Sequence, residues 1–445
     1  MKRILIKDGY VIDPETGTDG FFDVIVDNGT IAEVVPSRKK NRKLEPDDRT
    51  GSINKGQQTI DSVINASGKI VTPGLIDMHT HLREPGHEYK ETIETGCMAA
   101  AHGGFAAVCC MPNTEPVNDN RSVTDFILKK AKMAVGVRVY PVGAITRGLR
   151  GESLAEYGEL KAAGVVALSD DGNPVMNAQA MRRALEYAKG FDLLIIAHCE
   201  DRHLGANGVV NEGVTATRLG LAGIPNASEA VMVARDLALC ELTGGSLHIA
   251  HVSTEDSVCL IREAKARGVP VTAETAPHYF SLTEEAVINY NTNAKVNPPL
   301  RTEKDQEAIK QGLADGTIDV IASDHAPHSS VEKELEFDAA ANGLLGLETS
   351  LSLSLALVET GILSQKNLVQ KMSTNPARIL GLNHLGLRPG NPADVTIIDP
   401  GKEFVVDAHA FRSKSRNTPF DGLQLKGKAV VTMVGGKIVY DETKD

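Results

Sequence analysis

The middle of the chain, roughly residues 70–385, alternates short apolar runs of β type with amphipathic stretches of helical length. AMRRALEYAK and EAVMVARDLALCEL repeat their apolar positions every three to four residues, as one face of a helix does. Strands that alternate with helices in this way predict a parallel sheet, and the number of β-type runs matches a (β/α)8 TIM barrel. The eight runs are KIVTPGLIDMHTHLR, FAAVCCMPN, VRVYPVGAIT, GVVALSDDG, LLIIAHCE, SLHIAHVST, VPVTAETAPHYF and DVIASDHAPH.

The two ends of the chain have a different pattern, with short β-branched runs broken by Gly, Asn or Asp. Asn28-Gly29 and Gly435-Gly436 each lie between alternating apolar stretches, which is typical of a two-residue hairpin turn. We therefore predict an α/β protein in which residues 1–69 and 386–445 form a composite β-sandwich domain beside a barrel at 70–385. Residues 36–58 show no periodicity, so we expect a solvated surface loop of unassigned role.

The amino-acid composition argues against nucleic-acid-binding, membrane and secreted proteins. Lys and Arg number 47 against 58 Asp and Glu, a net charge of −11 that disfavours nucleic acid as a partner. No apolar run approaches the roughly 18 residues of a membrane helix, and the start MKRILIKDGYVIDP lacks the apolar stretch of a signal peptide. None of the six cysteines forms a C-x-x-C pair. We expect a soluble, cytoplasmic protein without a membrane or nucleic-acid partner.

Six of the eight β-type runs end in residues that suit a functional site. Because the carboxyl ends of all strands of a barrel lie at one face, these side chains are expected to converge there. They are His79, His81 and Arg83 after the first run, Asn113 after the second, Asp170 and Asp171 after the fourth, His198 after the fifth, His251 after the sixth, and Asp324 and His328 after the eighth.

His79 and His81 lie on the same side of a strand, because strand side chains repeat every two residues. The pair alone would fit ordinary polar packing equally well. Together with His198, His251 and Asp324 it indicates a metal site, and a set of N and O ligands without cysteine favours Zn²⁺ over Mn²⁺, Co²⁺ or Fe²⁺. Strand parity leaves open whether Asp170 or Asp171, and whether Asp324 or His325, faces the site. It also favours a packing role for His248.

Ten motifs spread along nearly the whole chain resemble the bacterial dihydroorotases of the amidohydrolase superfamily, most closely the long form with a bridging aspartate. They include DMHTHLREPGHEYKETIETG at 77–96, SDDGNPVM at 169–176, HIAHVSTEDSV at 248–258, SDHAPH at 323–328 and FRSKSRNTPF at 411–420. The resemblance implies the reversible cyclisation of N-carbamoyl-L-aspartate to L-dihydroorotate, with release of water, by a metal-activated hydroxide.

Residue by residue, the resemblance implies the following roles. The implied ligands of one or two Zn²⁺ ions, two being favoured, are His79, His81, Asp171, His198, His251 and Asp324, with Asp324 also the general acid and base. The implied substrate contacts are Arg83, Asn113, Asn297, His328 and the backbone of Asn342 and Gly343. Two stretches depart from the family: Ala341-Asn342-Gly343 replaces a sequence like Pro-Phe-Gly, and TAPHY at 275–279 stands where relatives usually have a Thr and a second His.

Alternatives from the same superfamily are hydantoinases, dihydropyrimidinases and allantoinases. These usually bridge their metals with a carboxylated lysine on the fourth strand, and here GVVALSDDG offers no Lys. The guanidinium of Arg83 also suits a substrate that carries a carboxylate. A non-catalytic partner of aspartate carbamoyltransferase, and a catalyst that needs that partner, remain further alternatives. We expect a homodimer, and residues 329–341 form either a lid or a plain surface loop.

Overall fold

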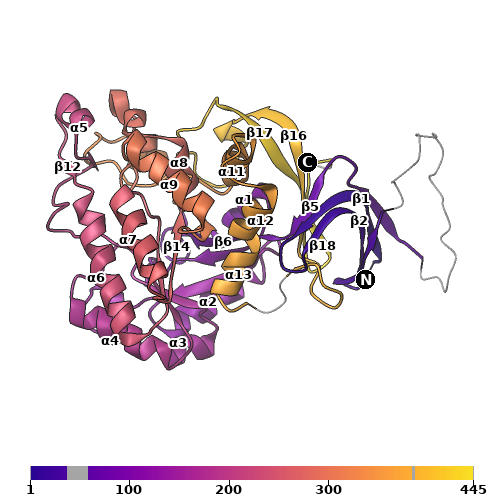
Figure 1. The fold of residues 1–445 in the computed structure, drawn as a ribbon, viewed down its shortest axis with the longest axis horizontal. Coiled ribbons are helices and arrows are strands. Elements are labelled where there is room, and N and C mark those ends of the chain that lie inside the picture. The colour runs from indigo at the N-terminus through magenta and orange to yellow at the C-terminus, as the bar shows by residue number, and fades with distance from the viewer. Residues whose placement is uncertain (1, 38–58, 383–385, 444–445) are drawn as a thin grey trace.

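The computed structural model describes residues 2–37, 59–382 and 386–443. Most of the predicted 36–58 loop, residues 38–58, lies outside the described residues. Within them the chain forms a barrel surrounded by helices and a separate β-sheet built from both ends of the chain (Figure 1). In the part of the chain that the structure describes, no helix combines the length and apolar character needed to cross a bilayer.

The barrel sheet has eight strands among the described residues, all pairing in parallel and following one another in chain order. The first and last strands meet at a bridge between Thr80 and His325, and the His81 amide donates to the His325 carbonyl at 2.9 Å. Each predicted run supplies one strand, so the barrel prediction is confirmed. The strands are β6 (Leu75–Thr80), β7 (Phe105–Cys110), β8 (Arg138–Gly143), β9 (Ala167–Ser169), β10 (Leu194–Ala197), β13 (Leu247–Ile249), β14 (Val271–Thr275) and β15 (Val320–Ile321).

Helices cover the outside of the barrel (Figure 1). Several begin where an Asn or Thr side chain accepts backbone N–H groups of the first turn, as Asn177 does before α4 and Thr254 before α7. The main helices are α1 (Ile93–Gly103), α2 (Arg121–Ala131), α3 (Tyr157–Ala163), α4 (Ala178–Lys189), α6 (Ala227–Thr243), α7 (Glu255–Ala266), α9 (Glu303–Asp315) and α11 (Ser350–Glu359). Shorter elements in the connections are α5 (Val214–Leu219), α8 (Pro277–Ser281), α10 (Ser330–Lys333), α12 (Gln365–Val369), α13 (Asn375–Ile379) and the strand pair β11 (Val210–Asn211) and β12 (Gly223–Ile224).

Side chains fill the interior of the barrel, so it is a packed core rather than a channel. Met78, Cys109, Val142, Ile196 and Val320, from five different strands, belong to one buried apolar cluster. A second and larger apolar cluster packs the outer faces of the strands against the helices. The strands therefore have both faces buried, which leaves their carboxyl ends as the place for polar chemistry.

The second sheet joins the two ends of the chain. Strand β5 pairs in parallel with β1 and antiparallel with β16, a strand more than 300 residues later. Strand β5 lies just past the predicted boundary at 69/70, and the exact domain boundaries stay a prediction. The sheet contains β1 (Ile4–Asp13), β2 (Thr18–Asp27), β3 (Thr30–Pro36), β4 (Ser62–Asn65), β5 (Ile70–Pro73), β16 (Val395–Val405), β17 (Gln424–Val434) and β18 (Lys437–Asp441).

The second sheet has its own apolar core, which includes Ile6, Val24 and Ile397, and the two predicted hairpin turns come into contact at its edge. Asn28-Gly29 connects β2 to β3 and Gly435-Gly436 connects β17 to β18, and all four residues have positive φ. A Cβ placed on Gly436 would lie 2.5 Å from the Cα of Gly29. Both turns and the sandwich arrangement are thus confirmed, and only glycine allows the two backbones to approach so closely.

Candidate metal centre

Five side chains from the ends of four barrel strands meet at the carboxyl face of the barrel. His79 and His81 come from the end of β6, Asp171 follows β9, His198 follows β10 and His251 follows β13. They form two overlapping groups whose ligand atoms lie within 4.8 Å of one another: His79, His81 and Asp171, and Asp171, His198 and His251. All five are buried.

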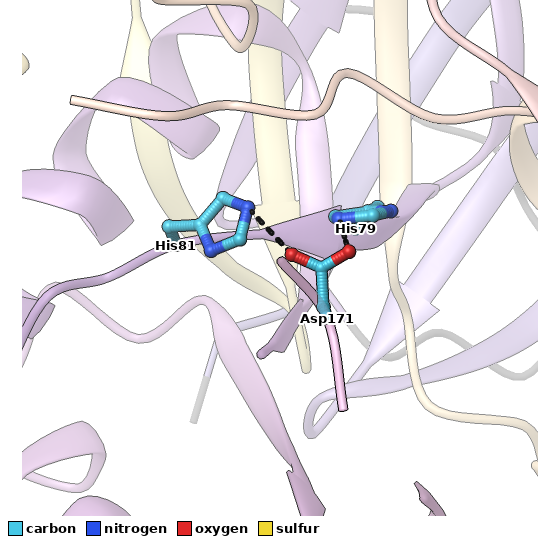
Figure 2. Close-up of side chains that lie close together, drawn as sticks. All are labelled: His79, His81 and Asp171. Carbon is cyan, nitrogen blue, oxygen red and sulfur yellow. Dashed lines mark ion pairs between the residues drawn. The ribbon is translucent and has the colours of Figure 1, made fainter. Parts of the chain in front are cut away.

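Asp171 is the member shared by both groups. Its Oδ1 lies 3.3 Å from His79 Nε2 and 3.4 Å from His251 Nε2, while its Oδ2 lies 3.5 Å from His81 Nε2. Figure 2 shows the Asp171 carboxylate between the imidazoles of His79 and His81, with a different oxygen turned toward each. A carboxylate placed this way can bridge two cations.

Asp324, after β15, completes one side of the centre. Its Oδ1 lies 3.3 Å from His81 Nε2 and 3.5 Å from His79 Nε2. The adjacent His325 turns away, with its Nε2 3.4 Å from Glu91 Oε2. Asp170 likewise turns away from the centre and bonds the hydroxyl and amide of Thr146. The choices that strand parity left open are therefore resolved toward Asp171 and Asp324.

The imidazoles are oriented by oxygens behind them. Nδ1 of His79 donates to Glu274 at 2.6 Å, Nδ1 of His81 donates to Asn113 at 2.9 Å, and Nε2 of His198 donates to Glu200 at 3.1 Å. Each ring thus holds its proton on the nitrogen that faces outward. The other nitrogen is turned toward the centre, which is the orientation that metal-bound histidines have.

The atoms at the centre fit a divalent cation. His79 Nε2 and Asp171 Oδ1 are buried and have no hydrogen-bond partner within the described residues. His198 Nδ1 and His251 Nε2 point at each other across 2.7 Å. Buried polar atoms are normally satisfied, so a cluster of buried nitrogens and oxygens without hydrogen-bond partners fits a shared divalent cation. The mixed N and O donors agree with the family of metals expected from the sequence.

Electrostatics support the same conclusion. Burial opposes ionisation of Asp171, but the imidazoles of His79, His198 and His251 hold the pKa of its carboxyl well below its usual range. Burial likewise opposes ionisation of Asp324, yet His79 and His81 lower its pKa. Burial also works against a charged His198, whose pKa the carboxylates of Asp171 and Glu200 raise to about 9. The centre therefore holds buried carboxylates that need positive charge for compensation.

Three residues at this face have backbones in the left-handed region, where non-glycine residues are strained. They are Arg83 with φ 60°, His251 with φ 34° and Asp324 with φ 49°. Such strain persists only where the surrounding structure imposes it, and it concentrates at functional sites. All three stand just beyond the end of a barrel strand, at the face where the metal centre lies.

A cluster that we call the cationic corner lies beside the metal centre and consists of Arg83 and Lys90 around His328. Arg83 Nε donates to the Pro327 carbonyl at 3.1 Å, and its Nη2 lies 3.2 Å from His328 Nε2. Lys90 Nζ lies 3.5 Å from the other ring nitrogen of His328. Burial and these two cations lower the pKa of His328, so its ring is neutral. Among the described residues no carboxylate lies within bonding distance of the buried Arg83 guanidinium, which therefore suits an anionic group of a ligand.

The remaining expected substrate contacts have other partners. Asn113 holds His81, as described above, and the Asn297 amide donates to Glu200 at 3.0 Å. The Gly343 amide donates to the Lys295 carbonyl at 2.9 Å, and its carbonyl accepts from Asn417 and Lys333. Asn342 is exposed. The structure thus brings Asn113 to a ligand and Asn297 to the partner of a ligand, and the role of all four residues toward substrate stays a prediction.

Glu274, at the end of β14, was missed by sequence reasoning. Its Oε1 lies 2.6 Å from His79 Nδ1, and its Oε2 lies 3.2 Å from His248 Nε2. A lone carboxylate in a buried β-type run was the signal that could have revealed it. His278, in the TAPHY stretch at 275–279, is fully buried, and burial lowers its pKa to about 4. The seventh strand, which had no assigned site residue, therefore takes part in orienting the ligands.

A Glu274→Gln variant is expected to bind metal about 10–100-fold more weakly, the usual cost of losing an outer partner of a ligating histidine. The amide keeps the size of the side chain but not the negative charge that holds the His79 proton outward. Metal content after dialysis against buffered metal measures the effect. Glu241→Gln, at a surface pair with Arg267, is the control, and equal metal affinity in both variants would contradict this role.

Comparisons with known proteins agree with one another. Residues 68–257 match a family model described as dihydro-orotase-like. A dihydroorotase from Syntrophus aciditrophicus is 55% identical over 440 residues, covering 99% of this chain and 100% of that protein. A dihydroorotase from Desulforapulum autotrophicum is 62% identical over 377 residues, covering 85% of this chain and 88% of that protein.

Solved structures with the same fold include an L-hydantoinase (dihydropyrimidinase) from Arthrobacter aurescens. It has a TM-score of 0.85 and 26% identity, and the match covers 99% of this chain and 96% of that one. A dihydropyrimidinase from Brevibacillus agri has a TM-score of 0.82 at 24% identity, with 99% and 95% coverage, and shows the fold alone.

Proposed function

The chain belongs to the dihydroorotase family, and from that premise we propose how its residues carry out the reaction. The protein is a cyclic amidohydrolase, and the proposed reaction is the reversible ring closure of N-carbamoyl-L-aspartate to L-dihydroorotate with release of water. The observation that carries the proposal is the juxtaposition of the metal centre with the Arg83 corner, which places an amide-activating group beside a carboxylate-binding group.

A divalent cation fits the centre, and we propose two zinc ions. His79, His81, Asp171 and Asp324 would hold one, and Asp171, His198 and His251 the other. Bound there, the ions lower the pKa of a water and polarise an amide carbonyl. The bridging position of Asp171, which meets both groups, supports two ions rather than one.

Asp324 would move the proton. Its lowered pKa keeps the carboxylate ionised at neutral pH, so it can accept a proton from the attacking water in the ring-opening direction. The same carboxyl then donates that proton to the departing ring nitrogen. In the ring-closing direction the two transfers run in reverse order.

Arg83, Asn113 and His328 would bind and orient the carboxylate of the substrate. The guanidinium is already fixed by the Pro327 carbonyl, so little ordering is needed when the ligand arrives. The neutral ring of His328 contacts the same guanidinium through its Nε2 and is proposed to help orient it toward the carboxylate. Asn297 and the backbone of Asn342 and Gly343 are proposed as further contacts around the ring. Binding the carboxylate in this way holds the substrate in the orientation that the reaction needs.

Arg83→Met is expected to raise the KM for dihydroorotate about 10–100-fold, as loss of a charged hydrogen bond of about 1.5–3 kcal/mol predicts. The change in kcat should be much smaller, because Arg83 does not touch the proton path. Steady-state kinetics on metal-analysed protein measure both constants. Arg121→Met, at an exposed pair on α2, is the matched control, and a collapse of kcat at constant KM would remove Arg83 from substrate binding.

A spectrophotometric assay of dihydroorotate hydrolysis tests the function as a whole. We expect turnover of dihydroorotate to exceed that of hydantoin, dihydrouracil and allantoin, since only dihydroorotate carries a carboxylate for Arg83. A preference for one of the other cyclic amides would refute the proposal. Metal analysis on the same sample identifies the ions, and an active metal-free enzyme would refute the proposed centre.

We also propose a cytoplasmic homodimer that associates with aspartate carbamoyltransferase. The acidic composition and the free thiols of all six cysteines support the location. Light scattering of the purified protein tests the dimer. Co-purification and a rise of dihydroorotase activity on mixing test the association, and a fully active protein with no complex on mixing would argue against it. Movement of residues 329–341 as a lid stays a prediction.

A further inference from the structure

The segment 411–420, FRSKSRNTPF, lies between the second sheet and the site, and no role has yet been assigned to it. Its backbone and side chains bond the loop after β6: the Lys414 amide donates to Glu91 at 3.0 Å, and the Ser415 hydroxyl donates to the Lys90 carbonyl at 2.7 Å. That loop carries Arg83 at its start. The segment therefore packs directly behind the cationic corner.

Asn417 connects this segment to the other side of the corner. Its side-chain oxygen accepts the backbone N–H of His328 at 3.0 Å. Its side-chain nitrogen donates to the carbonyls of Ala326 at 3.0 Å and Gly343 at 3.1 Å. Asn417 is 4% exposed, so these three bonds have little competition from water. One amide thus fixes the positions of two predicted substrate contacts at once.

The contact region of Asn417 with Ala326, His328 and Gly343 is tightly packed. Gly343 has φ 133°, and a Cβ placed on it would lie 2.6 Å from Ala326 Cβ and 3.2 Å from His328 Cδ2. The Leu345 amide donates to the Asn417 carbonyl at 2.9 Å, and the Ala326 amide donates to the Leu344 carbonyl at 2.8 Å. Because His328 contacts Arg83, any displacement of the His328 or Gly343 backbone changes the geometry of the carboxylate-binding corner.

We propose that Asn417 is a positioning residue for the carboxylate specificity of the enzyme, acting through His328 and the Gly343 backbone. The inference rests on the proposed function, because it takes the Arg83 corner as the carboxylate site. Asn417 lies outside the metal centre and holds none of its ligands. Its loss should therefore weaken recognition of the carboxylate and leave metal binding intact.

Two variants test the proposal against one control. Asn417→Ala removes all three bonds, and Asn417→Asp keeps the volume and the acceptor for His328 but turns a second oxygen toward two carbonyls. Thr418→Val removes only a local bond within the segment, from the Phe420 amide to the Thr418 hydroxyl at 3.2 Å. Melting temperature and metal content are measured for each, and Asn417→Asp carries the test if Asn417→Ala does not fold.

The informative readout compares two ligands that differ only in the carboxylate. We expect the KM for dihydroorotate to rise on the order of 10-fold in the Asn417 variants, as the loss of neutral hydrogen bonds predicts. The inhibition constant of dihydrouracil, the same ring without the carboxylate, should stay within about 2-fold of wild type, and Thr418→Val should match wild type for both ligands. Equal weakening of both ligands would mean a merely structural role and overturn the proposal.

A double-mutant cycle with Arg83→Met adds an independent test. If Asn417 acts through the corner, its substitution should have little further effect once the guanidinium is gone, because coupled residues are not additive. Fully independent effects on kcat/KM would overturn the proposal. A wild-type enzyme that fails to hydrolyse dihydroorotate would instead refute the proposed function, so the two failures are distinguishable.

Discussion

An Asp324→Asn variant is expected to keep most of its metal and to lose about 10²–10⁴-fold in kcat, the usual range for removing a general acid–base group. The amide still offers an oxygen at the position of Oδ1, near His81 and His79, so the centre remains nearly complete. The amide cannot accept a proton, however, so no side chain carries the proton from the attacking water to the ring nitrogen.

The measurement is kcat for dihydroorotate hydrolysis together with metal equivalents per chain. Asp315→Asn is the control, since that carboxylate pairs with Arg262 at the surface. Near-normal turnover would remove Asp324 from the proton path. Loss of metal in proportion to activity would make Asp324 a ligand only.

An Asp171→Ala variant is expected to lose metal from both groups, because Asp171 is the one residue that they share among the described residues. The loss of affinity should exceed the about 10–100-fold that is typical of an outer partner, and turnover should fall with it. Metal titration followed by activity at saturating metal measures the two effects separately.

The chain offers a closely matched control for this variant. Asp170 is the preceding residue, equally buried, but it faces Thr146 on the other side of the strand end. Asp170→Asn should therefore keep wild-type metal content even if it lowers the melting temperature. Equal metal loss in the two variants would mean that the Asp171 effect comes from a damaged loop rather than from a lost ligand.

The barrel and the ligand set could be predicted because both depend on strand position. Each predicted run forms a strand, and residues at strand ends must gather at one face whatever their separation along the chain. Parity could show that Asp170 and Asp171 point to opposite sides. It could not choose between them, because the facing direction is set by the barrel as a whole.

Other parts of the site could not be derived from strand ends. Glu274 acts from within a strand, and its role depends on the distance to His79, which the sequence does not contain. Asn417 belongs to a connection of the second sheet, so no periodic pattern links it to His328. Asn297 was placed at the site through resemblance alone, whereas Asn113 also follows a strand end. The bonds of these two residues to Glu200 and His81 became visible only in three dimensions.

The pairing of β5 with β16 has a consequence for biosynthesis. A ribosome releases β5 early, yet the antiparallel neighbour of β5 is made only after the last barrel helix. Until then the early strands expose an unpaired edge, which is the kind of surface that draws nascent chains into aggregates. The strands that are made first therefore wait for the chain from Val395 onward before their sheet can be completed.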